Sequence, residues 1–161
     1  MYWFPILILY IVSPAVHNLY LSDAICPASS ESGFNLRFPH DAHFYRNQTQ
    51  WINFEVSGKM RVNNQEKGDV WAYLIVPRSS ISRTPLHLRV SPGVIDRDYT
   101  GQLIVPIYSD QDFRVRRGDS IAQIVFPTLE PFSVEIVNFK NKRQTQRGHH
   151  SFGSGGFVPT G

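Results

Sequence analysis

Hydrophobic and polar residues alternate with a period of two along much of this 161-residue chain. At 51–56 the apolar face holds Ile52, Phe54 and Val56. Further stretches alternate in the same way: 59–62, 86–90, 113–115, 122–126 and 132–136. Side chains with this period lie on one face of a β-strand. The stretch 70–76 is nearly all apolar, which is typical of a strand covered on both faces.

Turn-forming residues divide these stretches. Eleven prolines and eleven glycines interrupt the chain at short intervals, and no stretch has a sustained helical period. Many short strands with turns between them are typical of an all-β barrel or sandwich. One helical turn is expected after Ser79 and Ser80, and Pro85 should end it because proline lacks the N–H that a continuing helix needs.

The first twelve residues are strongly apolar. They are too few to span a bilayer. They also lack the basic start of a signal peptide, because the first Lys or Arg is Arg37. We therefore expect a buried first strand and no membrane partner, with a signal or anchor as the alternative.

Composition changes near residue 138. The stretch 138–148 is polar and basic, and 151–161 is rich in glycine and serine. This change predicts a β-barrel domain at 1–137 and a flexible C-terminal arm at 138–161. Arg147 and Phe152 are unusual choices for a purely solvating tail.

Charge and cysteine content narrow the function classes. The formal net charge of +3, with 42% hydrophobic residues, permits a polyanionic ligand in a single-domain protein without requiring nucleic acid. Cys26 is the only cysteine, which excludes an intramolecular disulfide and a cysteine-rich zinc site. A reducing compartment, cytoplasm or nucleus, fits best. His149 and His150 lack a third ligand at suitable spacing and are interpreted as loop residues.

The segment 91–103 carries the first candidate chemistry. Its β-branched residues and turn formers predict a β-hairpin with Asp96, Asp98 and Tyr99 at the tip. A carboxylate held there can orient a water as general base. A tyrosine ring can lie against a sugar or a base. Taken alone, the segment is better interpreted as an Asx turn with a solvated tip.

Two further stretches carry candidate ligand-binding groups. Pro77–Ser80 follows a strand and offers a guanidinium fork and hydroxyls, which suit phosphate oxygens, although it also describes a surface turn. Gly118–Pro127 is a tight turn leading into a strand. Gln123 lies on the opposite face from Ala122. By itself it is interpreted as an outward side chain, with a ligand donor as the alternative.

Together and in this order, these stretches resemble the five motifs of the trimeric deoxyuridine triphosphatase (dUTPase) family. The matching stretches are Ser32–Leu36, Pro77–Ser80, Gly93–Gly101, Gly118–Gln123 and Arg147–Gly156. The resemblance implies a jelly-roll-like β-barrel and a homotrimer whose C-terminal arm crosses to a neighbour. It also implies hydrolysis of dUTP to dUMP and pyrophosphate by water attack at the α-phosphate, with Mg²⁺ bound mainly through the phosphates.

The resemblance assigns roles by matched position. Asp96 would be the catalytic base and Tyr99 would stack on the deoxyribose. The remaining expected substrate contacts are the backbone of Gly93, Val94 and Ile95 at the uracil edge, Arg78, Ser79, Ser80 and Gln123 at the phosphates, and Arg147, Phe152, Gly153 and Ser154 in the arm.

Three motifs depart from the family pattern. Asn35 replaces an aspartate and Ser120 replaces an arginine, which we interpret as joint loss of a structural ion pair. In the fifth motif His150 and Ser151 replace glycines, and 155–161 offers a second register. These departures support an alternative, a catalytically weakened nucleotide-binding or regulatory protein.

The sequence also offers two other functions. A nucleic-acid-binding barrel rests only on the basic stretch 140–147. A related dCTP deaminase shares the barrel, but Asp96 with Tyr99 favours the triphosphatase.

Overall fold

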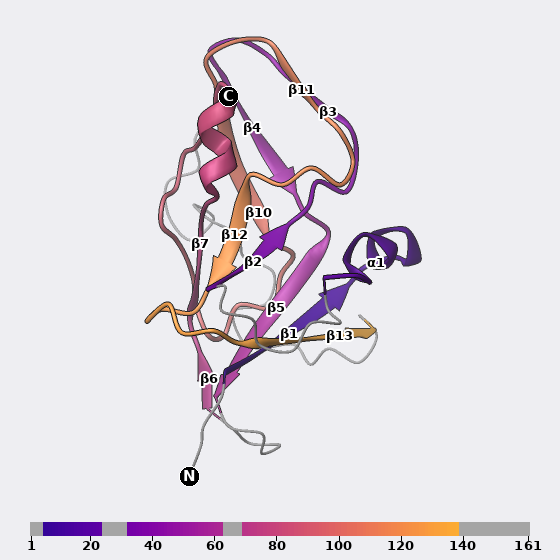
Figure 1. Ribbon diagram of the computed structural model, residues 1–161, viewed down its shortest axis with the longest axis vertical. Coiled ribbons are helices and arrows are strands. Elements are labelled where there is room, and N and C mark those ends of the chain that lie inside the picture. Colours follow the sequence, from indigo (N-terminus) through magenta and orange to yellow (C-terminus); the bar gives the residue numbers. More distant parts are fainter. Residues whose placement is uncertain (1–4, 24–31, 63–68, 139–161) are drawn as a thin grey trace.

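The computed structural model describes residues 5–23, 32–62 and 69–138, and these ranges form mainly short strands (Figure 1). In chain order the first elements are β1 (Pro5–Ile11), α1 (Pro14–Tyr20), β2 (Gly33–Leu36), β3 (Ala42–Phe44), β4 (Gln48–Asn53), β5 (Val56–Val62) and β6 (Asp69–Trp71). They are followed by β7 (Tyr73–Pro77), the 3-10 helix η1 (Ser79–Arg83), β8 (Leu86–Leu88), β9 (Gly93–Ile95), β10 (Ile104–Ser109), β11 (Phe113–Val115), β12 (Ala122–Val125) and β13 (Ser133–Asn138). The predicted all-β class is confirmed.

Four sheets share one core. Their strand orders are β13-β1-β5-β6, β2-β12-β7-β9, β4-β10-β8 and β11-β3. Strand β1 lies inside its sheet, parallel to β13 and antiparallel to β5, so it joins the beginning and the end of the described chain (Figure 1). Leu7 and Leu9 are completely buried. The prediction of a buried first strand is therefore confirmed.

The period-two pattern identifies the buried faces but not where the strands break. Phe54 and Val56 are buried and Trp51 is exposed, as predicted. However, Glu55 has a left-handed backbone with φ of 58°, so the chain turns there and leaves β4 and β5 in different sheets. The Glu55 N–H donates to Asn53 Oδ1 at 2.8 Å, which stabilises this local turn.

The prediction of one strand at 70–76, covered on both faces, is wrong. Strand β6 pairs with β5, whereas β7 pairs with β12 and β9. The chain passes from one sheet to the next at Ala72, so each short strand is covered by different neighbours. Trp71 remains 40% exposed.

Two short helices flank the strands. The expected helical turn after Ser79 is confirmed as η1. Helix α1 was not predicted, because its seven residues bury only Val16 and Tyr20 and give no sustained period. Its local signals are nevertheless present: Ser13 caps the first turn and Pro14 follows at the start.

The predicted hairpin at 91–103 is also wrong in its pairing. Strand β9 pairs with β7, and β10 pairs with β4 and β8, so the two strands lie in different sheets. The turn between them links two sheets. The turn residues were identified correctly, but local turn chemistry does not determine which strand each arm joins.

Gly58 and Tyr73 make a close contact across the core. A Cβ on Gly58 would lie 2.6 Å from the Tyr73 hydroxyl oxygen and 3.1 Å from Cζ. The Tyr73 hydroxyl is buried and has no hydrogen-bond partner among the described residues. Burial, and to a lesser extent the nearby Tyr99, raises the pKa of Tyr73, so its hydroxyl stays neutral at ordinary pH.

Gly58→Ala should therefore lower the free energy of unfolding by about 1–3 kcal/mol through overpacking. Tyr73→Phe should be neutral or stabilising, because it removes a buried hydroxyl that has no described partner. In the Tyr73→Phe background the cost of Gly58→Ala should shrink, since the colliding oxygen is gone. Urea unfolding of the four proteins in this double-mutant cycle measures the coupling. An unchanged cost in both backgrounds would contradict the proposed contact.

Candidate functional site

The second and fourth motifs meet where β7 ends and β12 begins. These strands are antiparallel, with Pro77 opposite Ala122. The Arg78 N–H donates to the Ile121 carbonyl at 2.8 Å. Arg78 Nη1 and Ser80 Oγ both donate to the Ser120 carbonyl, at 3.1 Å and 3.3 Å. The predicted phosphate-binding residues Arg78 and Ser80 are thus held together by the backbone of the fourth motif.

The side chains of this cluster differ in exposure. Arg78 and Ser80 are half-buried, and Ser79 is exposed. Only one of the five guanidinium donors of Arg78 is used in the contact with Ser120. The arrangement can therefore present a cation and a hydroxyl to an anion while backbone contacts fix their position.

Gln123 extends the same cluster along β12. It lies opposite Val76 on one side and Asn35 on the other. Its Nε2 donates to the Pro77 carbonyl at 3.3 Å. A Cβ added at Gly33 would collide with the Gln123 amide, reaching 2.7 Å from its Cδ. The side chain is half-buried, and its amide is held by the Pro77 carbonyl of the neighbouring strand β7.

Gly33 is a neighbour of the candidate site that sequence reasoning did not single out. It was matched only as a letter of the first motif, yet it provides the space in which the Gln123 amide lies. The signal that could have revealed it is a glycine in a strand, which often marks a close approach. Only the pairing of β2 with β12 shows which side chain approaches.

The third motif lies at the end of β9. Asp96 is half-buried, and Asp98 is exposed. Tyr99 is only 9% exposed, packs with the core, and donates its hydroxyl to the Gln102 carbonyl at 2.6 Å. The expectation of a ring displayed at a hairpin tip is therefore corrected. Gly93 and Ile95 are buried and Val94 is 49% exposed, so the backbone of β9 borders the surface at Val94.

One chain does not bring the third motif to the second and fourth. Strands β7 and β9 are antiparallel, with Tyr73 opposite Ile95. Asp96 consequently lies beyond the start of β7, and Arg78 lies beyond its end. Six residues of extended chain separate the two positions, or about 20 Å at roughly 3.3 Å per residue. The carboxylate and the candidate phosphate site are at opposite ends of the same strand pair.

The hypothesis of an ion pair lost at positions 35 and 120 receives no support from the register. Gln123, and not Ser120, lies opposite Asn35. Ser120 lies three residues before Gln123, a displacement of about 10 Å in extended chain. Residues at these two positions are therefore not strand-pair neighbours.

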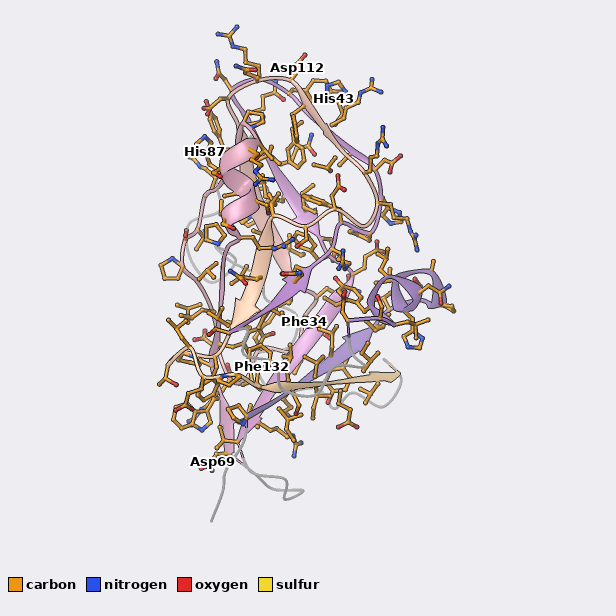
Figure 2. All side chains as sticks on the ribbon, in the orientation of Figure 1. Phe34, His43, Asp69, His87, Asp112 and Phe132 are labelled. Carbon is orange, nitrogen blue, oxygen red and sulfur yellow. The ribbon has the colours of Figure 1, made fainter. Side chains whose placement is uncertain are left out.

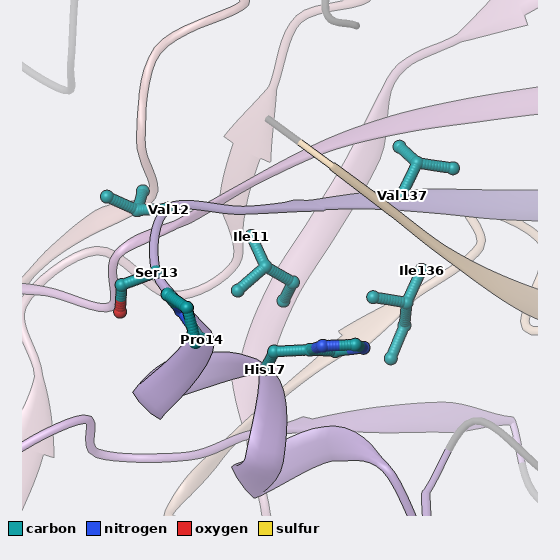
Figure 3. Close-up of a pocket in the computed structure, with 7 residues that line it drawn as sticks. All are labelled: Ile11, Val12, Ser13, Pro14, His17, Ile136 and Val137. Carbon is teal, nitrogen blue, oxygen red and sulfur yellow. The ribbon is translucent and has the colours of Figure 1, made fainter. Parts of the chain in front are cut away.

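A separate pocket of about 240 Å³ lies between β1, α1 and β13 (Figure 3). Ile11, Val12, Pro14, Ile136 and Val137 make most of its wall. The two polar lining residues are Ser13 and His17, and none of the predicted site residues takes part. The pocket is therefore not the candidate site.

The described ranges also limit metal chemistry. Within 5–23, 32–62 and 69–138, no group of three or more His, Cys, Asp or Glu side chains could hold a metal ion. In Figure 2, His43 and Asp112 lie near one end of the molecule and Asp69 lies near the other. No helix in these ranges is long and apolar enough to cross a membrane. The predicted arm contacts, Arg147, Phe152, Gly153 and Ser154, lie outside the described residues.

Fold and site define an all-β protein with a hydroxyl- and guanidinium-bearing cluster of the kind that binds phosphate. The family model of dUTPase matches residues 22–156, which is most of the chain, so the chain belongs to the dUTPase family. The family assignment made from the motifs is thereby confirmed.

Individual relatives agree with this assignment. Deoxyuridine 5′-triphosphate nucleotidohydrolase from a gamma-proteobacterium is 41% identical over 88 residues, which cover 53% of this chain and 62% of the relative. The Kluyveromyces lactis enzyme of the same name is 37% identical over 84 residues, covering 51% and 55%. The chain thus spans little more than half the length of these curated relatives.

Solved structures show the same fold. A mutant dUTPase from phage phi11 of S. aureus, described as coordinating a structural Mg(II) ion, has a TM-score of 0.52 at 18% identity, covering 74% of this chain and 88% of that one. The dUTPase of Staphylococcus bacteriophage 80alpha has a TM-score of 0.52 at 19% identity, covering 74% and 87%.

Proposed function

We propose that this protein is a dUTP pyrophosphatase that hydrolyses dUTP to dUMP and pyrophosphate. The observation that carries the proposal is the cluster at the junction of β7 and β12, where Arg78 and Ser80 are ordered on the Ser120 carbonyl within a dUTPase-family chain. Ser79 and Gln123 belong to the same cluster. These groups would bind the phosphates, with Arg78 offsetting their negative charge.

Asp96 would activate the water. Its carboxylate would accept a proton as the water oxygen bonds to the α-phosphorus, and the bond from that phosphorus to the bridging oxygen of the β-phosphate would break. Pyrophosphate would leave with the bridging oxygen. The backbone of Gly93, Val94 and Ile95 would bind the uracil edge, and Tyr99 would support the deoxyribose.

The separation of Asp96 from Arg78 supports a site shared between copies of the chain. The two lie about 20 Å apart along one strand pair. A single triphosphate could contact both types of residue if a neighbouring copy placed its β9 end against this β7 end. We therefore propose a homotrimer with composite sites. In it, the arm 138–161 would bring Arg147, Phe152, Gly153 and Ser154 over a neighbour's nucleotide.

Mg²⁺ fits this site as an ion held mainly by the substrate. The described residues offer no cluster of three metal ligands, and Mg²⁺ commonly binds through phosphates with few protein groups. When bound, it would neutralise phosphate charge. Arg78, Ser79, Ser80 and Gln123 would orient the same phosphates from the protein side.

One assay tests the proposal directly. Pyrophosphate release should be measured with dUTP, dCTP and dTTP, each with Mg²⁺ present. Rapid release from dUTP alone is the expected result. Nucleotide binding without release would instead identify a binding or regulatory protein, and equal release from all three would exclude uracil selection.

Gly33→Ala should raise KM for dUTP roughly tenfold. The added Cβ would displace the Gln123 amide from its present position, and a hydrogen bond to a charged group contributes about 1.5–3 kcal/mol. Steady-state kinetics of Gly33→Ala, Gln123→Ala and the double variant provide the test. If Gly33 acts only through Gln123, the double variant should be no worse than Gln123→Ala alone. Additive losses would show that Gly33 acts independently of Gln123.

Truncation after Gln146 should leave a folded trimer with kcat/KM reduced roughly ten- to hundredfold. The change removes Arg147, whose charged hydrogen bond to phosphate would contribute about 1.5–3 kcal/mol. It also removes the arm proposed to lie over the nucleotide, where such a segment would exclude water. Light scattering and thermal melting should match the full chain. Dissociation on truncation would show that this segment is structural.

A further inference from the structure

We propose that Arg37 is a positioning residue for the phosphate-binding cluster, acting through the turn that leads into β12. The inference rests on the proposed function, because it assigns Arg37 to that same site. Arg37 lies outside the residues expected to contact substrate and follows β2 directly. Its side chain is only 28% exposed, and its described side-chain hydrogen bonds reach Asp23 and the Gly118 carbonyl, both distant in sequence.

Asp23 holds the Arg37 guanidinium in a two-point contact. Nε donates to Asp23 Oδ2 at 2.6 Å, and Nη2 donates to Asp23 Oδ1 at 3.0 Å. The hydrogen bond that Arg37 donates to the Asp23 carboxylate is the main reason that the pKa of Arg37 is raised. Such a fork fixes the plane of the guanidinium as well as its position. Because Asp23 offsets the charge, Arg37 would act on the site through geometry and not through a long-range field.

The remaining guanidinium nitrogen reaches the turn between β11 and β12. Nη1 donates to the Gly118 carbonyl at 2.9 Å. Gly118 has φ of 93°, so a residue tolerant of left-handed backbone occupies this point. The Gly118 N–H donates to the Phe38 carbonyl, and the Phe38 N–H donates to the Asp119 carbonyl, both at 2.8 Å. Arg37 and Phe38 together therefore hold both sides of the turn.

This turn supplies the carbonyl that holds Arg78 and Ser80 of the phosphate-binding cluster. Ser120 follows Gly118 by two residues, a span of at most about 7 Å. Its carbonyl accepts from Arg78 Nη1 and Ser80 Oγ. A shift of Gly118 would be transmitted through this short backbone to Ser120 and then to the orientation of Arg78. The chain of contacts is Asp23, Arg37, Gly118, Ser120 and Arg78.

A purely structural role is the competing explanation, in which Arg37 only attaches α1 to the barrel. Tyr20 provides the matched control for that role. Its hydroxyl oxygen accepts the Arg37 backbone N–H at 2.9 Å, and its ring stacks on Phe34. Tyr20→Phe removes this attachment of α1 while leaving the Arg37 guanidinium and the Gly118 carbonyl in contact. If Arg37 only attaches α1 to the barrel, Arg37→Ala and Tyr20→Phe should have the same effect, which is a loss of stability.

The test uses the full chain with Arg37→Ala, Arg37→Lys and Tyr20→Phe. Arg37→Ala should raise KM for dUTP, and Kd for non-hydrolysable α,β-imido-dUTP, roughly ten- to hundredfold through misplaced phosphate contacts. The value of kcat should change much less. Arg37→Lys should restore little, because an ammonium cannot reproduce the fork and the third bond. Tyr20→Phe should lower Tm without a matching rise in KM or Kd.

Amide hydrogen exchange at 118–121 gives a readout that needs no nucleotide. Exchange there should accelerate in Arg37→Ala more than in Tyr20→Phe. Unchanged exchange in Arg37→Ala, or equal rises of KM in both variants, would overturn the inference. If the unmutated protein neither binds the analogue nor releases pyrophosphate, the proposed function fails, and the exchange measurement still decides whether Arg37 positions the turn.

Discussion

Asp96→Asn should lower kcat for dUTP by roughly 10²–10⁴-fold, the usual contribution of a positioned general base. Asparagine has nearly the same shape as aspartate but cannot accept a proton from the attacking water. The Kd of α,β-imido-dUTP should change little, because in the proposed composite site the phosphate contacts come from the end of β7 in a neighbouring copy. Single-turnover kinetics with saturating Mg²⁺ measure the chemical step directly.

Asp98→Asn is the matched control for this variant. Asp98 lies two residues away in the same turn and is exposed. The substitution changes the net charge by the same amount and should leave kcat within about threefold, as expected for an exposed charge outside the reaction. Equal losses in the two variants would point to a general charge effect. Near wild-type turnover in Asp96→Asn would exclude Asp96 as the base.

The buried faces of the strands could be predicted from the sequence because burial follows local side-chain alternation. Ile75, Phe54 and Ile124 are all within the core, and each belongs to an alternating or apolar stretch. The first strand could be predicted from its apolar length alone. The positions where strands break could not be predicted in the same way. The left-handed backbone at Glu55 and the change of sheet at Ala72 depend on tertiary packing, which local alternation does not encode.

The sequence motifs predicted which residues of the second and fourth motifs are neighbours, but not how the candidate site is arranged. The motifs grouped Arg78 and Ser80 with the turn before Gln123. In the structure both side chains donate to the Ser120 carbonyl in that turn. The error at 91–103 arose because turn residues specify a reversal of the chain and not the partner of each strand. The distance between Asp96 and Arg78 follows from the register of β7 with β9, which only the folded chain provides.

Tyr99→Ala should lower the free energy of unfolding by roughly 3–5 kcal/mol, as expected for removing a large buried aromatic side chain. Tyr99 is 9% exposed and belongs to the core cluster. Tyr99→Phe keeps the ring and should lose only about 1 kcal/mol, through the missing hydrogen bond to the Gln102 carbonyl. Thermal and urea unfolding of the three proteins measure this structural role.

The same variants test whether Tyr99 also selects the sugar. If the ring lies beneath the deoxyribose, a ribose 2′-hydroxyl would be buried without a partner, at a cost of roughly 1–3 kcal/mol. The unmutated protein and Tyr99→Phe should then prefer dUTP over UTP by about tenfold or more in kcat/KM, because both retain the ring. Tyr99→Ala should relax this preference when assayed well below its Tm. A ring that only packs the core predicts lower stability with the preference unchanged. Equal use of dUTP and UTP by the unmutated protein would refute the role in sugar selection, because a Tyr99 ring that excludes the 2′-hydroxyl must already do so in the unmutated protein.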